Sequence, residues 1–284
     1  MSEERQWECG VMRDAVKATL KGGTLTVSGN GPMKSWDAST PTPWYSEPSF
    51  VKLVVESGVT KIGDGAFNCC AGLQSVEIAE GVKSVGIIAF AGCTSLTSIK
   101  IPNSMASVGE GMFMACERLS SVTIGSGVTT IDEGAFSECA SLASINIPAG
   151  VTRIEKSAFN CCTSLKSIAI PDSVTYIGIG AFDGCTGLTS VTIGRGVTKI
   201  DHGAFCGCSS LTSIDTNYVK ELGNGVFKEC VALTSVTLGK DMAAIGARAF
   251  LECRRLASVT CSNPTRPAIG EDAFKDVDKS AIRF

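Results

Sequence analysis

Cysteine is the residue type whose number and spacing raise the first chemical question. The chain has 284 residues, of which 14 are cysteine, and thiols in such numbers serve as disulfides, zinc ligands or nucleophiles. The sequence holds no Cys-x-x-Cys pair, which argues against a zinc module. Nine cysteines instead recur every 22 or 23 residues, at Cys70, Cys93, Cys116, Cys139, Cys162, Cys185, Cys208, Cys230 and Cys253. The role of these thiols therefore depends on the structure that repeats with this period.

Histidine, the other residue that commonly supplies catalysis and metal binding, occurs once, as His202. Most catalytic and metal sites built on histidine are therefore excluded. In other copies of the repeat described below, the position of His202 holds Asp64, Glu110, Lys156 or Asn224. A position that accepts so many side-chain types faces solvent, so we interpret His202 as incidental.

Three glycine pairs resemble the start of a phosphate-binding loop. These are Gly63-x-Gly65, Gly178-x-Gly180 and Gly223-x-Gly225, and none continues as G-x-G-x-x-G. Their recurrence indicates turn glycines. The 25 basic and 28 acidic residues give a net charge of −3, which argues against a nucleic-acid partner. We predict no catalytic residue, no cofactor and no metal site. No run of 18 apolar residues occurs, so we predict no membrane span.

The cysteine period belongs to a larger repeat. Each of the nine cysteines lies three residues after a phenylalanine and three before a leucine, and Val or Ile follows three residues later. The intervals between successive phenylalanines are 23 six times, then 22, 23 and 24 when Phe274 is included. The phenylalanines that precede the nine cysteines are Phe67, Phe90, Phe113, Phe136, Phe159, Phe182, Phe205, Phe227 and Phe250. We predict that both sets form ladders in the interior of a repeat protein.

Each unit contains two short strand patterns separated by turns. The first is Leu-x-x-Val/Ile-x-Ile, and the second is Val-Thr-x-Ile, followed by a glycine-rich bend and Ala-Phe. About 23 residues are too few for a core of their own, so each coil has to bury its apolar side against the next. The sequence therefore predicts a β-rich solenoid of short parallel strands with few helical turns, made of about ten repeats over residues 50–284.

Stacking explains the cysteines without redox or metal chemistry. In-register coils place neighbouring Cβ atoms ~4.8 Å apart, beyond the ~3.5–4.5 Å that a disulfide prefers. We therefore interpret the nine thiols as small apolar fillers inside a tight turn. Cys69, Cys161 and Cys206 fall outside the ladder, Cys9 lies in the N-terminal segment, and Cys261 takes an isoleucine position. We predict no disulfide for Cys9, although the sequence leaves one open.

Residues 1–49 lack the repeat and are predicted to form an N-terminal cap module. Residues 16–20 and 24–28, joined by Lys21-Gly22-Gly23, indicate a hairpin that covers the exposed edge of the first coil. Residues 32–49 contain four prolines and indicate an ordered loop. All three tryptophans, Trp7, Trp36 and Trp44, lie in this module. We expect them to pack the cap onto the first coil; the alternative is a small site for an aromatic ligand.

The exposed positions of the first strand are the natural binding face of such a solenoid. Two residues before each of them stands a serine, whose hydroxyl we expect to bond between adjacent coils. The candidate face lacks the Tyr, Trp and Arg side chains that dominate protein interfaces. The exposed residues of the second strand, such as Lys61, Arg153, Tyr176, Lys199 and Glu221, look scattered. The candidate protein-binding face consists of Glu77, Lys100, Thr123, Asn146, Thr192, Asp215 and Thr237.

The unit resembles the BspA-type leucine-rich repeat, C-x-x-L-x-x-V-x-I-P-x-x-V-T-x-I-G-x-x-A-F, over residues 50–284. The resemblance implies a right-handed leucine-rich-repeat solenoid whose last coil, residues 261–274, closes the array. It also implies that one more strand begins at residues 281–284, so the chain is expected to belong to a longer protein. Members of this family are often surface or secreted proteins that adhere to host matrix or to other cells.

Three classes of function follow. The first is a non-enzymatic scaffold that binds a protein ligand, such as a host matrix or cell-surface protein, and we expect it to be monomeric. The second is a self-associating solenoid that uses the edge near residues 281–284. The third, an enzyme on a solenoid face, would depend on His202, Glu77 or Asp215. The resemblance places the protein at a cell surface or outside the cell, yet the charged N-terminus, MSEERQWECG, does not have the pattern of a signal peptide.

Overall fold

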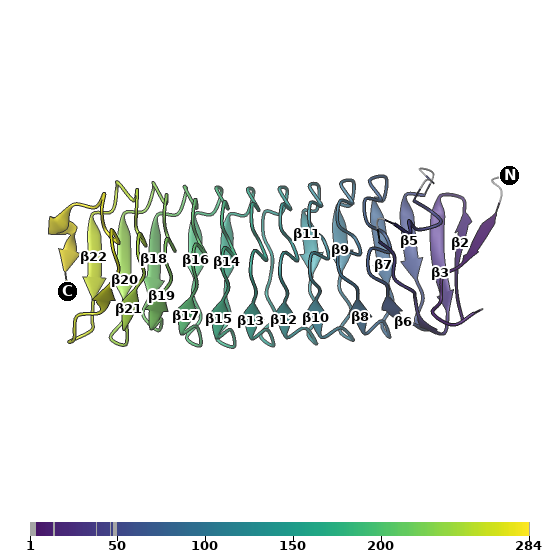
Figure 1. The fold of residues 1–284 in the computed structure, drawn as a ribbon, viewed down its shortest axis with the longest axis horizontal. Helices are drawn as coiled ribbons and strands as arrows, with labels where there is room; N and C mark the ends of the chain where they lie inside the picture. The colour runs from purple at the N-terminus through teal and green to yellow at the C-terminus, as the bar shows by residue number, and fades with distance from the viewer. Residues whose placement is uncertain (1–3, 14, 38, 46, 48–49, 284) are drawn as a thin grey trace. The chain divides into compact units, whose positions relative to one another are not determined.

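The structure is a computed structural model that describes residues 4–13, 15–37, 39–45, 47 and 50–283. It is a β-solenoid of about ten turns with parallel strands and almost no helix, as the sequence predicts (Figure 1). The chain divides into two compact units, residues 1–141 and 142–284. This division falls inside the repeats.

The N-terminal module of the first unit is built on an antiparallel hairpin. Strands β2 (Val16–Lys21) and β3 (Thr24–Gly29) pair in register through the two-residue turn Gly22-Gly23. Both turn glycines have positive φ, +57° and +78°, a conformation that favours glycine. The predicted hairpin is confirmed, and β3 pairs in parallel with β5 (Lys52–Val55) of the first coil. Strand β1 (Arg5–Glu8), which the sequence pattern did not reveal, pairs with β2.

The tryptophans attach this module to the first coil, as expected. Trp44 is fully buried, its ring stacks on Phe67 with 5.5 Å between centroids, and its Nε1–H donates to the carbonyl of Ala66 at 2.9 Å. Trp36 and Trp7 meet Trp44 edge-on at 5.3 and 6.2 Å. The module thus continues the phenylalanine ladder with an indole ring.

Each coil of the first unit contributes one strand to each of two rows. The first-strand row continues from β5 through β7 (Ser75–Ile78), β9 (Ser98–Lys100) and β11 (Ser121–Thr123). The second strands pair as β4 (Gly31–Pro32), β6 (Val59–Ile62) and β8 (Ser84–Val85), and as β10 (Ser107–Val108) with β12 (Thr130–Ile131). All these pairings are parallel, and except for that of β4 with β6 each joins residues 23 positions apart in the sequence.

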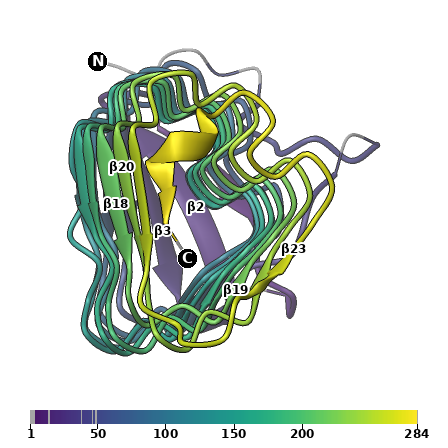
Figure 2. The same ribbon diagram turned by 90° about the vertical axis from the view of Figure 1, so that its left-hand side faces the viewer.

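The second unit follows the same plan (Figure 2). Its first strands pair as β14 (Ser167–Ala169) with β16 (Ser190–Thr192), and as β18 (Ser213–Thr216), β20 (Ser235–Leu238), β22 (Ser258–Cys261) and β24 (Ile282–Arg283). Its second strands are β13 (Arg153–Ile154), β15 (Tyr176–Ile177), β17 (Lys199–Ile200), β19 (Glu221–Leu222), β21 (Ala244–Ile245) and β23 (Ala268–Ile269). Strand β24 is the additional strand expected at the end, and the short 3₁₀ helix η1 (Lys279–Ala281) precedes it.

The interior of each unit is a set of side-chain ladders. The nine ladder phenylalanines are each 0% exposed, and neighbouring rings within a unit stack with centroids 5.1–5.7 Å apart. The nine ladder cysteines are buried free thiols. Among the described contacts are S–H hydrogen bonds from ladder thiols to the carbonyl of the phenylalanine one coil earlier; Cys208 Sγ, for example, lies 3.3 Å from the carbonyl oxygen of Phe182. The thiol is therefore a hydrogen-bond donor as well as a filler.

The expectation for the serine column is wrong. In the described part of the chain, no serine of this column donates a side-chain hydrogen bond to a neighbouring coil; the column consists of Ser75, Ser98, Ser121, Ser144, Ser167, Ser190, Ser213, Ser235 and Ser258. The position immediately before this column does form inter-coil hydroxyl bonds, as when Ser120 Oγ donates to the Thr97 carbonyl and Thr189 Oγ1 to the Lys166 carbonyl. In-register strands hold the serine side chains pointing the same way, whereas the preceding residue lies before the strand and its hydroxyl turns back to the previous coil.

Candidate binding surface

The predicted first-strand face lies at the surface of both units. In the first unit Glu77, Lys100 and Thr123 are exposed, and Lys52 Nζ pairs with Glu77 Oε1 at 2.6 Å. In the second unit the exposed positions are Asn146, Thr192 and Asp215, and Thr237 is half-buried. The structure thus presents these side chains to solvent. None of the seven is aromatic or an arginine, and in the described strands their row continues through Thr260 to Arg283 of β24.

The second-strand face of the second unit brings together three of the side chains that looked scattered in the sequence. Strands β13, β15 and β17 pair in register, with Arg153 opposite Tyr176 and Tyr176 opposite Lys199. Three bulky polar side chains, one from each of three successive coils, therefore lie side by side. They were missed because their types differ, whereas the ladders were found because theirs repeat.

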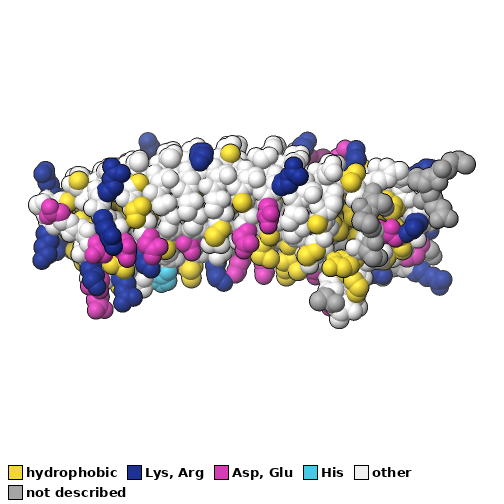
Figure 3. Space-filling view, turned by 90° about the horizontal axis from the view of Figure 1, so that it is seen from above, with side chains coloured by type: hydrophobic (Ala, Val, Ile, Leu, Met, Phe, Trp, Pro, Cys, Tyr) yellow, Lys and Arg dark blue, Asp and Glu magenta, His cyan; other side chains and the backbone are white. Residues whose placement is uncertain are grey.

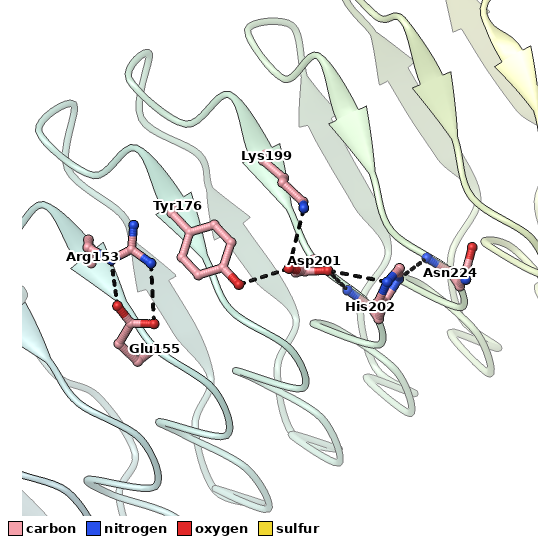
Figure 4. Close-up of polar contacts among 7 residues, drawn as sticks. All are labelled: Arg153, Glu155, Tyr176, Lys199, Asp201, His202 and Asn224. Atoms are coloured by element: carbon pink, nitrogen blue, oxygen red, sulfur yellow. Dashed lines mark hydrogen bonds and ion pairs between the residues drawn. The ribbon is translucent and has the colours of Figure 1, made fainter.

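Direct contacts join this row into a cluster (Figure 4). The guanidinium of Arg153 lies over the Tyr176 ring, 4.5 Å from its centroid, and pairs with Glu155. The hydroxyl of Tyr176 donates to Asp201 Oδ2 at 2.8 Å, and Lys199 Nζ lies 3.6 Å from the same oxygen. The Arg153–Asp201 cluster, meaning Arg153, Glu155, Tyr176, Lys199 and Asp201, is thus a chain of charge-assisted contacts.

Asp201 anchors the cluster from a buried position. Burial alone raises the pKa of a carboxyl group, but the hydrogen bonds from the His202 backbone N–H and the Tyr176 hydroxyl, with the charge of Lys199, leave the pKa of Asp201 lowered. Burial and the bond to Asp201 raise the pKa of Tyr176 to about 12. The carboxylate therefore stays charged and the phenol stays protonated at neutral pH, so the contact between them persists.

His202 faces solvent as predicted, with 54% of its side chain exposed. It is not incidental, however, because its Nδ1 accepts a hydrogen bond from the backbone N–H of Asn224 at 2.7 Å. The side chain of Asn224 repeats this contact one coil further, where its Oδ1 accepts from the Ala247 N–H. In the described part of the chain, no serine, threonine or cysteine is hydrogen-bonded to His202. The arrangement links coils and presents charge; it lacks a base paired with a nucleophile.

A shallow groove borders the cluster. Beyond Lys199 the second-strand row continues with Glu221, Ala244 and Ala268, and the two small side chains leave a hollow of about 430 Å³. Its floor is alanine and glycine backbone, and Lys199, His202 and Glu221 line it. Figure 3 shows charged side chains of both signs along one margin of this unit.

The sequence did contain a signal for Asp201. Its position in the repeat is glycine in the coils before and after it, at Gly178 and Gly223. A carboxylate where neighbouring coils have no side chain has room to reach across the bend.

Among the described residues, no group of three or more His, Cys, Asp or Glu side chains is arranged to hold a metal ion. No helix in the described ranges is long and apolar enough to cross a bilayer.

Comparison with known proteins places the chain in a family. It matches the family of the BspA type leucine-rich repeat region, in six copies, over residues 42–166 and 152–280. No curated protein sequence gives a match. Among solved structures, a leucine-rich repeat protein from Eubacterium ventriosum is 24% identical, with a TM-score of 0.50 and coverage of 100% of this chain and 97% of that one. The leucine-rich repeat protein of T. pallidum is 25% identical, with a TM-score of 0.52 and coverage of 74% and 83%.

A leucine-rich cell surface protein from Faecalibacterium prausnitzii is 23% identical, with a TM-score of 0.42 over 88% of this chain and 94% of that one. The family match covers both units and most of the chain, and it includes the ladder residues described above. The chain therefore belongs to the BspA-type leucine-rich repeat family.

Proposed function

We propose that this protein is a non-enzymatic scaffold that binds another protein through the second-strand face of residues 142–284. The observation that carries the proposal is the Arg153–Asp201 cluster beside its groove. Arginine and tyrosine are the side chains most enriched among residues that dominate binding energy. Here both are held in one orientation before any partner arrives, which reduces the entropy lost on binding.

The contacts explain how the surface stays ordered. Tyr176 is fixed at its hydroxyl by Asp201, and the Arg153 guanidinium lies on the Tyr176 ring. The adjoining groove offers a hollow beside a raised polar patch, a shape that accepts a projecting side chain or turn of a partner. Lys199, His202 and Glu221 would supply the polar rim.

The setting we propose is adhesion, at a cell surface or outside the cell, to host matrix or to other cells. The support is family membership, because BspA-type leucine-rich repeat proteins are typically surface proteins. We propose that the chain acts as a monomer.

The test starts from a panel of purified extracellular-matrix and cell-surface proteins immobilised on a biosensor. For each binder, Tyr176→Ala is expected to weaken affinity by about 30-fold or more, as truncating a dominant interface residue does. Tyr218→Ala is the matched control, because Tyr218 is an exposed tyrosine that likewise lies under an arginine, Arg195, at 5.8 Å. It is expected to leave affinity unchanged.

The first-strand face is tested in parallel with Thr192→Arg, which places a bulky charge on the candidate face of the sequence prediction. If only this variant weakens binding, the scaffold proposal stands and its location is wrong. If no protein of the panel binds the wild-type chain, the proposed function itself is contradicted. Circular dichroism of each variant shows that a loss of binding is not a loss of fold.

A further inference from the structure

The first unit contains a cavity of its own, which shares no residue with the Arg153–Asp201 cluster. It has a volume of about 650 Å³ and lies between the proline-containing loop of the N-terminal module and the bends of the first two coils. We call it the Trp36–Ile88 cavity. The residues that line it include Trp36, Asp37, Tyr45, Asp64, Ile87 and Ile88. Figure 3 shows hydrophobic side chains gathered beside the projecting loop.

One wall of the cavity is apolar, and part of it is an isoleucine in an unfavourable backbone conformation. Ile88 has φ +51°, in the left-handed region that β-branched residues avoid. The same position in the neighbouring coils is glycine, at Gly65 and Gly111, with φ +60° and +56°. Ile87 beside it is 48% exposed at a position that is mostly polar in other coils. The second coil therefore departs from the repeat at two adjacent positions, and both departures add apolar surface to this cavity.

The opposite wall is aromatic. Tyr45 is 62% exposed, and Trp36 is largely buried and held edge-on against Trp44. Lys34 Nζ lies 5.7 Å from the centre of the Trp36 ring, so a cation already rests against one aromatic group of this region. Lys34 does not line the cavity, and the Tyr45 ring has no such cation in the described structure.

The rim carries two carboxylates whose partners are all neutral. Asp37 Oδ1 accepts hydrogen bonds from the backbone and hydroxyl groups of Ser39 and Thr40, which lower the pKa of Asp37 to about 2. Asp64 accepts from the Ser35 hydroxyl and from the backbone N–H of Ile87. Within the described residues neither carboxylate forms an ion pair. Two negative charges therefore border an apolar and aromatic hollow without a cation to balance them.

We propose that the Trp36–Ile88 cavity binds an arginine side chain of a partner polypeptide. Arginine combines the features that these walls complement: a methylene stem for the isoleucines, a planar cation that stacks on an aromatic face, and donors in a fork that suits a carboxylate. The inference does not rest on the proposed second-strand site, because the two share no residue. It makes the N-terminal module a recognition element in addition to a cap.

The test uses the full chain labelled at isoleucine methyl groups and a short probe, acetyl-Gly-Leu-Arg-Leu-Gly-amide, in an NMR titration. The methyl signals of Ile87 and Ile88 are expected to shift on titration, while that of Ile179 stays fixed. The same peptide with citrulline in place of arginine keeps the shape and loses the charge. We expect it to bind at least about fivefold more weakly, and Asp64→Asn to weaken the arginine peptide similarly.

Two variants separate the apolar wall from folding. Ile87→Ala should weaken binding severalfold, while Ile179→Ala, the same change at the equivalent exposed position four coils later, should have no effect. Ile88→Gly removes the side chain while relieving its left-handed backbone, so it should keep the fold yet bind more weakly. Equal affinity for the arginine and citrulline peptides, or equal effects of the Ile87 and Ile179 variants, would overturn the proposal.

Discussion

Truncating one ring in the middle of the phenylalanine ladder probes the feature on which the coil structure depends. Phe182 is the clearest choice, because it is 0% exposed and stacks on both sides, with centroids 5.2 Å from Phe159 and 5.1 Å from Phe205. Phe182→Ala removes the ring and leaves a cavity between two coils. We expect a large loss of folding free energy.

The expected loss follows from how little the surroundings relax. The Phe182 N–H donates a hydrogen bond to the Ala204 carbonyl at 2.7 Å, and the Phe182 carbonyl accepts one from the Cys208 thiol. These bonds to the backbone fix the spacing of the coils. Large cavities that cannot collapse give the upper part of the range for buried aromatic truncation. We therefore expect Phe182→Ala to cost about 4–5 kcal/mol.

The assay is urea unfolding followed by circular dichroism, with Phe274→Ala as the matched control. Phe274 is half-buried, and its ring stacks on Phe250 at 5.0 Å at the end of the ladder. Truncating Phe274 should cost about 2 kcal/mol, because its side chain buries less apolar surface on folding and the end of the array relaxes more freely around the missing ring.

The comparison decides the matter more firmly than either value alone. Losses that agree within about 0.5 kcal/mol would contradict the reasoning, since the interior and terminal rings differ in burial and in stacked neighbours. In that case the stability of the coils would reside in the strands, and the ring ladder would be a minor contributor.

The remaining predictions concern the thiols, the buried carboxylate and the bend. In native protein the nine ladder thiols should be alkylated at least about 100-fold more slowly than the exposed thiol of Cys69. The reason is burial, which raises the pKa of the Cys70 thiol, for instance, to about 12. Peptide mass spectrometry measures the alkylation rate at each cysteine, and equal rates would disprove the interior ladder. Asp201→Asn should lower the free energy of unfolding at pH 7. This loss of stability relative to wild type should shrink as the pH falls below about 4 and through the lowered pKa of Asp201, because the stabilising charge is lost there. Urea midpoints measured at several pH values test this, and a difference that does not change with pH would argue against it. Gly178→Ala should cost about 1–3 kcal/mol, because the added Cβ would lie 2.7 Å from backbone atoms of Glu155 and Lys156, and an unchanged melting temperature would refute that contact.

The repeating interior was predictable from the sequence because the coils carry the same apolar residue types at the same positions. Phe, Cys and Leu occur at matching positions in nine coils, and burial in one coil implies burial in all. The hairpin was predictable for a different reason, since Gly22-Gly23 between two alternating segments specifies a two-residue turn. Both inferences use local or periodic signals, which survive without knowledge of side-chain directions.

The candidate surface was not predictable in the same way. Arg153, Tyr176 and Asp201 differ in type, so no column of identical residues announces them, and their contacts depend on how side chains bend across the pleat. The role of His202 depended on a backbone N–H one coil away. The Trp36–Ile88 cavity required the path of the proline-containing loop, which composition alone does not give. What was missed is the part of the molecule where coils differ.

The thiol-to-carbonyl bonds carry an evolutionary consequence. Each one, like each ring stack, joins a coil only to its immediate neighbour. Duplicating or deleting a stretch of gene that encodes one whole coil would therefore create one new junction between partners that already fit. We therefore expect a gain or loss of whole coils to preserve the thiol bonds and ring stacks, whereas a shift by part of a coil would put the ladders out of register.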